Sequence, residues 1–387
     1  MKAVILAAGE GTRLKPLTDL RPKPMIPVAN RPLLEHVVEA VAAAGITEIV
    51  LVVGYHRERI QNHFGDGGEW GVEVTYAGQD KQLGTGDAVL QAEPYVDGDF
   101  VVLNGDRVIE SRLIERVVDE RTATGDPVVS VTRVDEPHLY GVVEVGDGLL
   151  ESIHEKPAPY ETDSDLINAG VYGFGPEVFS AIRGTEPDGE LELTAVLERW
   201  LRERPVRAIN HRGEWLDVTR PWDLLAVNGR ILDRVGPAWA DSATGVEVTN
   251  VSEKTTIGEN STVQPGSVVL RGTAIGDNVT VKPNAYVENA VLLSDVTVGP
   301  GAVLKDCIVG ANVTVGPNTT IEGGDADVVL DDVVHRNVRF GGIVGDNTTL
   351  GANVSVAPGT VVGNDVEVCS GCVVSGQVAS GVEVRRG

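Results

Sequence analysis

The residues from 6 to 23 combine small side chains, glycines and two cations in a pattern suited to binding a polyphosphate. An apolar run from Ala3 to Leu6 predicts a buried strand, and the small residues after it allow the backbone to approach a ligand closely. Arg13 offers a planar fork of donors to phosphate oxygens, and Lys23 adds a second positive charge. Backbone amides and cations that converge on one ligand are the usual solution for a polyphosphate. The segment therefore predicts a nucleoside triphosphate site with contacts from Leu6, Ala7, Ala8, Gly9, Gly11 and Thr12.

Two commoner phosphate-binding motifs do not account for this segment. A P-loop needs Gly-Lys-Ser or Gly-Lys-Thr after a spacer of four residues, and the segment has neither. A dinucleotide-binding loop needs a third glycine, but Leu14 and Lys15 stand in that neighbourhood. The segment instead resembles the signature of sugar-1-phosphate nucleotidylyltransferases of the glucose-1-phosphate uridylyl and thymidylyl type. That signature runs from a Leu-Ala-Ala-Gly turn to a Pro-Lys-Pro, here residues 6–9 and 22–24.

A second match to this family concerns the nucleotide base. Gln79, followed by Leu-Gly-Thr-Gly at residues 83–86, matches the family's base-reading segment. The resemblance implies that the Gln79 amide pairs with the edge of a pyrimidine, while Gly84 and Thr85 place backbone groups against the base. Since an amide can pair with such an edge, the residue types suit the role that the resemblance gives them.

A third match concerns a metal. Asn104, Gly105 and Asp106 follow an apolar run and match the family's Gly-Asp turn, whose aspartate binds magnesium. Asp217, in Trp-Leu-Asp at residues 215–217, matches the second metal ligand. The resemblance therefore implies Mg²⁺ as the cofactor, on Asp106 and Asp217. Two aspartates are enough, because Mg²⁺ commonly takes one or two carboxylates and fills its other positions with phosphate and water.

Sugar contacts are implied in the same way. Tyr-Gly at 140–141, Glu-Lys-Pro at 155–157 and Asn-Ala-Gly at 168–170 match family segments in order and in approximate spacing. The resemblance implies that Gly141, Glu155 and Asn168 hold sugar hydroxyls and that Lys156 holds the phosphate of the sugar. Each match is weak alone, and their weight comes from their common order along the chain.

The resemblance implies an enzyme that transfers a nucleotidyl group from UTP or dTTP to a glucose-type sugar 1-phosphate and releases pyrophosphate. Arg13 and Lys23 would be its catalytic cations, and the phosphate that attacks needs no general base because it is already anionic. One alternative is a bifunctional N-acetylglucosamine-1-phosphate uridylyltransferase and glucosamine-1-phosphate acetyltransferase. Another is a regulatory or assembly subunit without catalysis, which the intact Arg13, Lys23, Asp106 and Asp217 disfavour.

The acetyltransferase alternative lacks its base in the sequence. Archaeal bifunctional relatives carry a His, and a Tyr three positions on, shortly before a repeat like Asp-Cys-Ile-Val-Gly, here residues 306–310. Pro300 and Val303 occupy those positions, and neither can accept a proton. His335 lies beyond Ile321, away from that repeat. We therefore expect the acetyltransferase activity to be absent.

The elements that must position these residues divide the chain into two parts. Up to residue 235, short apolar runs alternate with helical patterns, which predicts an α/β, Rossmann-like, mostly parallel sheet with helices on both faces. The expected strands are 3–6, 48–53, 99–103, 128–132 and 206–209, and the expected helices are 33–44, 88–93, 113–121 and 191–202. We predict a nucleotidylyltransferase domain at 1–235, a linker at 236–245 and a second domain at 246–387.

Aliphatic residues recur every six positions in the second domain, with Gly, Asn, Asp and Pro between them. Three runs carry the repeat: Ile257, Val263, Val269, Ile275, Val281, Val287; then Val303, Val309, Val315, Ile321; then Val338, Val344, Leu350, Val356, Val362, Val368, Val374. This period predicts a triangular coil with the aliphatic residues inside, and it resembles the left-handed parallel β-helix of hexapeptide-repeat proteins. Breaks in phase near Val291 and at 323–337 predict loops that leave the coil.

The net charge of the chain bears on its possible partners and on the salt concentration to which it is adapted. The chain of 387 residues has 57 acidic and 32 basic residues, a net charge of −25 that would repel nucleic acid and anionic membranes. Such a surplus favours a protein adapted to high salt, as in halophilic archaea. The sequence shows neither a signal peptide nor a membrane-length apolar run, so a cytoplasmic location is expected. The resemblance to hexapeptide-repeat proteins implies a homo-oligomer, a trimer or a dimer of trimers.

Overall fold

The computed structural model describes residues 1–386 except 187–188, 247–249 and 331–332. Its contacts divide the chain into two compact units. The first unit comprises residues 1–10, 22–25 and 33–216, and the second comprises residues 11–21, 26–32 and 217–387. The domain boundaries drawn from the sequence remain a prediction.

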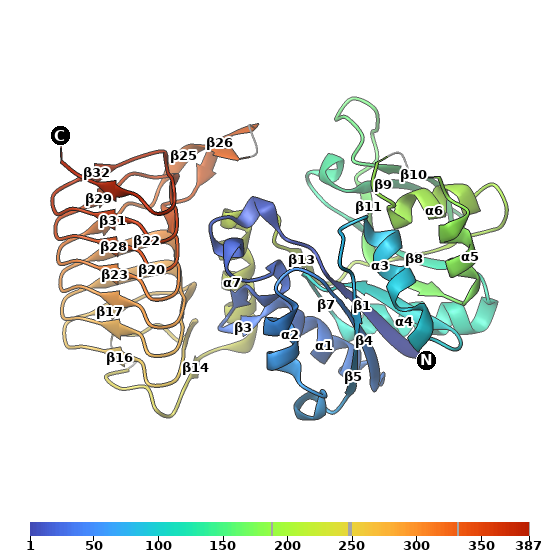
Figure 1. The fold of residues 1–387 in the computed structure, drawn as a ribbon, viewed down its shortest axis with the longest axis horizontal. Coiled ribbons are helices and arrows are strands. Elements are labelled where there is room, and N and C mark those ends of the chain that lie inside the picture. The colour runs from blue at the N-terminus through green and yellow to red at the C-terminus, as the bar shows by residue number, and fades with distance from the viewer. Residues whose placement is uncertain (187–188, 247–249, 331–332, 387) are drawn as a thin grey trace. The chain divides into compact units, whose positions relative to one another are not determined.

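A mixed sheet of nine strands, counted over the described residues, is the centre of the first unit (Figure 1). Its order is β5 (Glu73–Gly78), β4 (Glu48–Val53), β1 (Lys2–Ala7), β6 (Phe100–Asn104), β11 (Leu166–Phe174), β8 (Val128–Arg133), β12 (Arg207–Asn210), β10 (Leu149–Glu155) and β9 (Gly141–Gly146). The strands from β5 to β6 run parallel to one another. Strand β11 is antiparallel to β6 and β8, and β10 is antiparallel to β9 and β12. The five strands expected from the sequence are all present.

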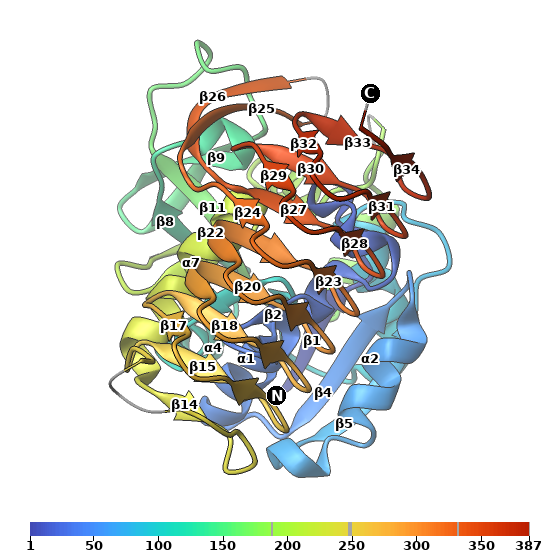
Figure 2. The same ribbon diagram turned by 90° about the vertical axis from the view of Figure 1, so that its left-hand side faces the viewer.

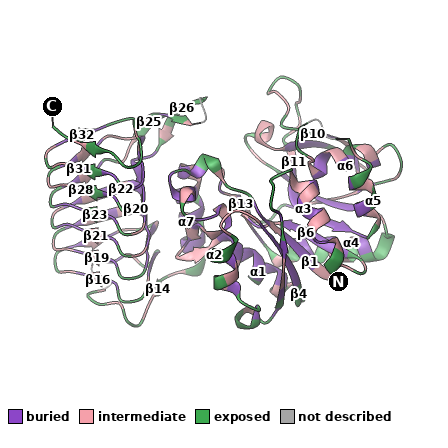
Figure 3. Ribbon diagram, viewed as in Figure 1, coloured by how far each residue is buried: buried purple, intermediate pink, exposed green. Residues whose placement is uncertain are grey.

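Helices cover both faces of this sheet, as expected, and alternate residues of β1 enter two different cores. Ala3 and Ile5 pack with α1 (Leu33–Ala43), α2 (Arg57–Phe64) and α4 (Ser111–Thr124). Val4 lies in the opposite core with α3 (Thr85–Gln91), α5 (Glu177–Arg183) and α6 (Leu193–Trp200). This alternation follows from the two-residue period of a strand, and it buries the parallel strands on both sides (Figure 3). Shorter elements of this unit are η3 (Lys23–Met25), η4 (Gly68–Trp70), η5 (Glu93–Tyr95), β7 (Arg107–Ile109), η6 (Pro137–Leu139) and most of β13 (Trp215–Asp217).

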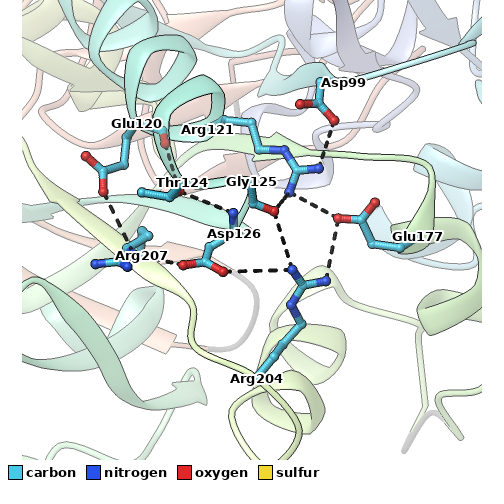
Figure 4. Close-up of polar contacts among 9 residues, drawn as sticks. All are labelled: Asp99, Glu120, Arg121, Thr124, Gly125, Asp126, Glu177, Arg204 and Arg207. Carbon is cyan, nitrogen blue, oxygen red and sulfur yellow. Dashed lines mark hydrogen bonds and ion pairs between the residues drawn. The ribbon is translucent and has the colours of Figure 1, made fainter.

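An ion-pair network closes the C-terminal end of α4 (Figure 4). Gly125 ends the helix in the left-handed conformation, and its N–H donates to the carbonyl of Arg121. The Arg121 guanidinium, 6% exposed, contacts Asp99 at 2.8 Å and Glu177 at 3.0 Å and donates to the Gly125 carbonyl at 2.7 Å. Arg204 shares Glu177, and other members of the network are Glu120, Thr124, Asp126 and Arg207. The buried guanidinium thus joins α4 to α5 and to the start of β6.

The second unit contains the predicted left-handed β-helix, whose coils stack as parallel strands on three faces (Figure 2). One face is β16 (Thr262–Val263), β19 (Thr280–Val281), β21 (Thr297–Val298), β23 (Thr314–Val315), β28 (Thr349–Leu350), β31 (Glu367–Val368) and β34 (Glu383–Val384). The next is β14 (Ala238–Trp239), β15 (Thr255–Ile257), β18 (Thr273–Ile275), β27 (Gly342–Val344), β30 (Thr360–Val362) and β33 (Gln377–Val378). The third is β17 (Val268–Val269), β24 (Thr320–Ile321), β29 (Ser355–Val356) and β32 (Val373–Val374). Strands β20 (Tyr286–Leu292) and β22 (Val303–Val309) continue around a corner and serve the last two faces.

The aliphatic column predicted from the six-residue period forms the core of this unit, with two corrections. Leu304 rather than Val303 enters the column, because Val303 lies outside it on β22. Val338 lies on β26 (Val333–Arg339), which pairs with β25 (Asp325–Leu330) as an antiparallel hairpin. This hairpin is the segment expected to leave the coil. The loop expected near Val291 was wrong, because Val291 is buried within β20.

Corners of the coil are built by residues that tolerate the left-handed conformation. Asn278, Asn312 and Asn347 have φ values of 57°, 58° and 59°, and their side chains hydrogen-bond to Asp295, Asn347 and Asp365 of the next coil. Asn and Asp adopt this conformation more readily than other side chains that carry a Cβ. The phase change near Val291 follows from one such corner: Asn289, with φ 48°, turns the chain in a shorter step. The composition of the repeat is therefore explained by its corners.

The second unit also contains α7 (Pro221–Val235) and two segments from the N-terminal part of the sequence. Those segments carry η1 (Thr12–Leu14), η2 (Leu17–Asp19), β2 (Pro27–Val28) and β3 (Arg31–Pro32). Asn228 of α7 is fully buried and accepts a hydrogen bond from the Ala29 N–H at 2.9 Å. It also donates to the Gly272 carbonyl of a coil at 2.8 Å. Over the described residues, no helix has the length and apolar character needed to cross a membrane.

We predict that Arg121→Met lowers the free energy of unfolding by about 2 kcal/mol, because hydrogen bonds to charged groups contribute about that much when they are shielded from water. The matched control is Arg133→Met, which removes an exposed ion pair with Asp165 and should cost less than about 1 kcal/mol. Urea unfolding followed by circular dichroism compares the midpoints. Equal midpoint shifts in the two variants would show that the network contributes no more than a surface pair.

Candidate active site

A pocket of about 220 Å³ opens in the first unit where three parallel strands of the sheet end. Leu6 comes from the end of β1, Gln79 follows β5, and Asn104 ends β6. Ligands bind at the carboxyl ends of parallel strands in sheets of this kind. Nine residues expected from the sequence line this pocket: Leu6, Ala8, Gly9, Lys23, Gln79, Gly84, Thr85, Asn104 and Asp106. Among these nine, the pocket brings together residues as far apart in the sequence as Leu6 and Asp106.

Two further expected residues, Ala7 and Gly105, do not line the pocket but belong to the backbone beside it. The side chain of Ala7 is buried in the core with Ile5. The Gly105 N–H donates to the Leu6 carbonyl at 2.9 Å, and a Cβ on Gly105 would stand 2.9 Å from that oxygen. Gly105 therefore allows the turn after β6 to close onto β1. By contrast, a Cβ on Gly9 would meet no atom of the described residues within 4 Å, so the backbone there faces open space.

Lys23 and Asp106 form a close ion pair on the pocket wall. The Lys23 Nζ lies 2.5 Å from the Asp106 Oδ2, and their side chains are 15% and 28% exposed. Burial tends to raise the pKa of Asp106, but the positive charges of Lys23 and Arg107 outweigh it and hold that pKa below its usual value. Asp106 is therefore an ionised carboxylate at neutral pH, and the pocket presents one cation and one anion side by side.

The Gln79 amide has a fixed orientation. Its Nε2 donates to the Asp87 Oδ2 at 2.8 Å and to the Gly84 carbonyl at 3.2 Å. Both partners are acceptors, so the nitrogen and not the oxygen of the amide must face them. Asp87 lies on α3, and sequence analysis did not include it. The arrangement leaves the Oε1 of Gln79 as the group that an arriving ligand would meet.

Gly84 and Thr85 are held by residues 191–193, which lie far along the sequence. Gly84 has a φ of 102°, and a Cβ there would stand 2.6 Å from the Leu191 carbonyl oxygen, so other residues are excluded. The Thr85 hydroxyl donates to the Glu192 carboxylate at 2.6 Å and accepts from the Leu193 N–H at 2.9 Å. The pocket lining that sequence analysis missed is Pro24, Gln82, Ala88, Glu190 and Glu192. Glu190 and Glu192 were missed because they lie far along the sequence and belong to no motif, whereas Pro24, Gln82 and Ala88 lie within or beside matched segments.

The expected sugar residues form a second cluster in the first unit. A Cβ on Gly141 would stand 3.1 Å from the Glu155 Oε2 and 3.7 Å from the Asn168 Cβ, so the three residues are neighbours. Lys156 lies beside Glu155, with its Nζ 3.4 Å from the Glu155 Oε1. A Cβ on Gly170 would stand 2.7 Å from the Asn104 Nδ2. Because Asn104 also lines the pocket, the two groups of residues are adjacent.

Two hydrogen bonds fix the side-chain amide of Asn168. Its Nδ2 donates to the Tyr172 hydroxyl at 2.6 Å, and its Oδ1 accepts from the Gly170 N–H at 3.1 Å. Burial raises the pKa of Tyr172 to about 12, although the bond to Asn168 opposes this, so the hydroxyl stays neutral. Arg107 lies over the rings of Tyr140 and Trp215, at 5.6 and 5.1 Å from their centroids. These contacts restrict the movement of the side chains in and beside the sugar cluster.

The remaining expected residues, Gly11, Thr12, Arg13 and Asp217, belong to the second unit. Gly11 has a left-handed φ of 70° and precedes η1, which contains Thr12 and Arg13. The Asp217 Oδ2 accepts from the Thr219 hydroxyl at 3.0 Å.

Asp223 follows Asp217 and caps α7 by accepting the N–H groups of Arg220 at 2.8 Å and Thr219 at 3.2 Å. Burial raises the pKa of Asp223 to about 6. Within the described ranges, no group of three or more His, Cys, Asp or Glu side chains could hold a metal ion.

Comparisons with known families cover most of the chain. Residues 2–234 match the family described as nucleotidyl transferase. Residues 251–340 match the GMPPB C-terminal domain, and residues 341–376 match six bacterial transferase hexapeptide repeats. The matched ranges agree with the sheet and the coils described above.

Individual relatives agree with these matches. Bifunctional protein GlmU of Methanococcus maripaludis is 34% identical over 400 residues, 97% of this chain and 94% of that protein. Glucose-1-phosphate thymidylyltransferase of Streptomyces griseus is 38% identical over 243 residues, 61% of this chain and 68% of that protein. The structure of UDP-glucose pyrophosphorylase complexed with UDP-glucose has a TM-score of 0.56, covering 60% of this chain and 98% of that one. Its 22% identity makes it a likeness of fold.

Proposed function

The chain belongs to the nucleotidyl transferase family, and from this premise we propose that it transfers a nucleotidyl group from UTP or dTTP to a glucose-type sugar 1-phosphate. Its class is that of the sugar-1-phosphate nucleotidylyltransferases, to which the glucose-1-phosphate thymidylyltransferase of Streptomyces griseus belongs by name. The observation that carries the finer proposal is the pocket in which an oriented Gln79 amide and the Lys23 and Asp106 pair share one wall.

The orientation of Gln79 supports a uracil or thymine base. Both bases present an N3–H donor, whereas cytosine presents an acceptor at the same position. The Gln79 Oε1 can accept from N3–H, because the Nε2 is already held by Asp87 and Gly84. A site whose polar group would be left unpaired by the wrong base discriminates strongly against it. UTP and dTTP therefore fit the pocket better than CTP.

The reaction then needs alignment and charge neutralisation rather than a general base. An oxygen of the sugar phosphate attacks the α-phosphorus in line, the bond from that phosphorus to the bridging oxygen breaks, and pyrophosphate leaves with the bond electrons. The nucleophile is already anionic, so no proton has to be removed. Lys23, Arg13 and Lys156 are the cations assigned to the phosphates, and their task is to hold two polyanions together against repulsion.

The oxygen donors present suit Mg²⁺. The Asp106 carboxylate is ionised, partly exposed and on the pocket wall, and the sequence resemblance implies Asp217 as the second ligand. Two carboxylates are sufficient for an ion that retains water and phosphate ligands. When bound, Mg²⁺ would supply positive charge to the phosphates at the reacting centre. Lys23 neutralises Asp106 in its absence, which keeps the carboxylate ionised and ready.

The sugar is assigned to the cluster of Gly141, Glu155, Lys156 and Asn168. Gly141 leaves room beside the Glu155 carboxylate, which can accept hydrogen bonds from sugar hydroxyls. Lys156 adjoins Glu155 and supplies a charge for the sugar phosphate. A glucose-type sugar is the proposal that these acceptor groups support. The trimer or dimer of trimers and the cytoplasmic, high-salt setting remain predictions from the sequence.

A bifunctional enzyme is the second candidate, since the Methanococcus maripaludis relative that spans nearly the whole chain is named a bifunctional protein. Several features weigh against it here. His335 lies on the hairpin of β25 and β26, and the centroid of its ring is 5.2 Å from the centroid of the Trp222 ring. Two of the three lysines of the coils are already engaged, Lys254 by Asp233 at 2.6 Å and Lys305 over the Tyr286 ring at 4.9 Å. We therefore propose the nucleotidyl transfer alone.

We predict that Asp106→Asn lowers kcat for nucleotidyl transfer at least about a thousandfold, because metal binding supplies several kcal/mol of transition-state stabilisation. The fold should persist, since the substitution keeps the shape of a partly exposed side chain. The control is Asp135→Asn, which changes an exposed aspartate and should retain full activity. Pyrophosphate release is measured with a panel of triphosphates and sugar 1-phosphates. Undiminished turnover of Asp106→Asn in saturating Mg²⁺ would refute the metal assignment.

A second prediction concerns base selection. Asp87→Ala removes the acceptor that orients Gln79, so the preference for UTP over CTP in kcat/KM should fall about tenfold or more. Gln91→Ala is the matched control, because Gln91 also donates to Asp87, at 3.4 Å, without touching Gln79. Initial rates with UTP, dTTP and CTP give the ratio. If Asp87→Ala kept the preference of the parent enzyme, Gln79 would not read the base in this way.

The third prediction is that no acetyl transfer occurs. Glucosamine 1-phosphate and acetyl-coenzyme A are incubated with the full chain, and free thiol is followed over time. The expected result is thiol release no faster than without enzyme. Steady release that disappears in His335→Ala would instead establish the bifunctional enzyme and identify its base.

A further inference from the structure

The loop between two pocket residues of the first unit is anchored in the second unit. Gly9 and Lys23 line the pocket, yet residues 11–21 between them make their contacts with the coils. This loop contains Gly11, Thr12 and Arg13, which the family signature assigns to the triphosphate. Residues 11–21 thus belong to the coil unit, whereas residues 10 and 22 beside them in the sequence belong to the first unit. The contacts of this loop with the coils therefore determine how the loop is held.

The loop first closes on itself. The Thr18 hydroxyl donates to the Gly11 carbonyl at 2.9 Å, and the side chains of Leu14 and Leu17 are 1% and 0% exposed. The short helices η1 and η2 lie between these points. Such internal bonds and buried side chains make the loop one compact piece, so an anchor at one point affects the position of Arg13 as well.

A buried ion pair is the first anchor. The Arg21 Nη2 lies 2.5 Å from the Asp346 Oδ2, and the two side chains are 8% and 4% exposed. The Arg21 Nη1 also donates to the Leu17 carbonyl at 3.3 Å. Charges are almost never buried to this degree unless they are paired, and loss of one partner leaves the other without compensation. This pair therefore fixes the loop to one coil.

A buried amide is the second anchor. The Asn364 Nδ2 donates to the Pro16 carbonyl at 3.1 Å and to the Asp19 carboxylate at 3.2 Å. Its Oδ1 accepts the Asp346 N–H at 2.7 Å, and the Asp346 Oδ1 accepts the Ala311 N–H at 2.8 Å. Three stacked coils thus share one polar network with the loop, which gives the anchor a rigid base.

The repeat by itself does not require this arrangement. Asp277 occupies the same place in Ile-Gly-Asp-Asn (275–278) that Asp346 occupies in Val-Gly-Asp-Asn (344–347). The Asp277 Oδ1 accepts the Glu259 N–H at 2.8 Å, the bond that Asp346 makes to Ala311, but Asp277 is exposed. An aspartate at this corner serves the coil without burial and without an arginine. The pairing of Asp346 with Arg21 is an additional feature that concerns the loop.

A second segment adds to the same support on the other side of Lys23. Residues 26–32 also belong to the coil unit, and Asn30 on their turn donates from its Nδ2 to the Ile275 carbonyl at 2.5 Å. Asn228 of α7 binds the Ala29 N–H of the same turn. The pocket cation Lys23 therefore lies on a short stretch, residues 22–25, with an anchored segment before it and another after it.

We propose that Asp346 and Asn364 of the β-helix are positioning residues for the triphosphate site, because they hold the loop that presents Gly11, Thr12 and Arg13. The inference rests on the proposed function for the identity of the ligand. The β-helix thereby holds the signature loop, in addition to any role in assembly. The sugar cluster, by contrast, is built entirely within the first unit.

The test compares KM for the two substrates in the full-length enzyme. In Asp346→Asn and in Asn364→Ala, KM for UTP should rise about tenfold or more, since small displacements of a binding group carry large costs. KM for the sugar 1-phosphate should change by less than about twofold. Asp277→Asn is the matched control and should leave both values unchanged. Calorimetric titration of UTP without the sugar measures the same loss as weaker binding.

Each result decides the matter. A selective rise in KM for UTP, with an unchanged control, supports the positioning role. Parental KM values, equal rises for both substrates, or a fall in kcat that only follows a lower melting temperature would overturn it. If Asp346→Asn does not fold, Asn364→Ala, which keeps the ion pair, decides in its place. A parent enzyme that transfers no nucleotide would refute the proposed function instead, so the two failures are distinguishable.

Discussion

Repulsion between anions is the constraint on which this structure depends. The two proposed substrates are both phosphates, and the chain itself has a net charge of −25. Long-range attraction therefore cannot bring the substrates in, and each cation must act at short range from a fixed place. Lys23 meets this need through its 2.5 Å pair with Asp106, in a pocket wall where both side chains are largely shielded from water. High salt would screen the general repulsion but act less on such a shielded pair.

Rigidity at the site follows from that constraint, and the fold supplies it by several routes. Parallel strands buried on both faces bring Leu6, Gln79 and Asn104 to one edge of the sheet. Hydrogen bonds to Asp87 and to the Tyr172 hydroxyl orient the amides of Gln79 and Asn168. The ion pair between Arg21 and Asp346 attaches the loop that carries Arg13 to the coils. A common physical theme is that flexible polar side chains are fixed by buried partners before a substrate arrives.

The regular repeat of the coils is also what makes a special contact recognisable. Corner residues such as Asn278 and Asn347 adopt the left-handed conformation and bond to residues of the neighbouring coils. Asp346, which precedes one of these corners, is buried and has an arginine partner, while Asp277 at the same place in the repeat is exposed. In a structure with equivalent positions, such a departure indicates a local task that the coil alone does not impose.

Sequence analysis predicted the strands and helices well where hydrophobic periodicity was strong. The six-residue repeat indicated the triangular column correctly from Ile257 onward, because an inward position at a fixed period can be read without knowing any contact. It was wrong near Val291 and at Val303, because two steps of the column are one residue shorter and no loop forms at either. Val287 and Leu292 flank the left-handed Asn289, and Leu304 and Val309 flank the left-handed Asp306. The phase of the six-residue repeat depends on the backbone conformation of single corner residues, which the amino-acid composition hardly indicates.

By itself the sequence determined the family, the two kinds of architecture and most of the residues that line the pocket, because these are encoded in local motifs and short periods. Only the tertiary structure decided which acceptors orient Gln79 and Asn168, that Glu192 holds Thr85, and that Asp346 and Asn364 hold the signature loop. Those contacts join residues up to 348 positions apart. No local pattern marks such pairs, since each depends on how the whole backbone brings distant side chains within hydrogen-bonding distance.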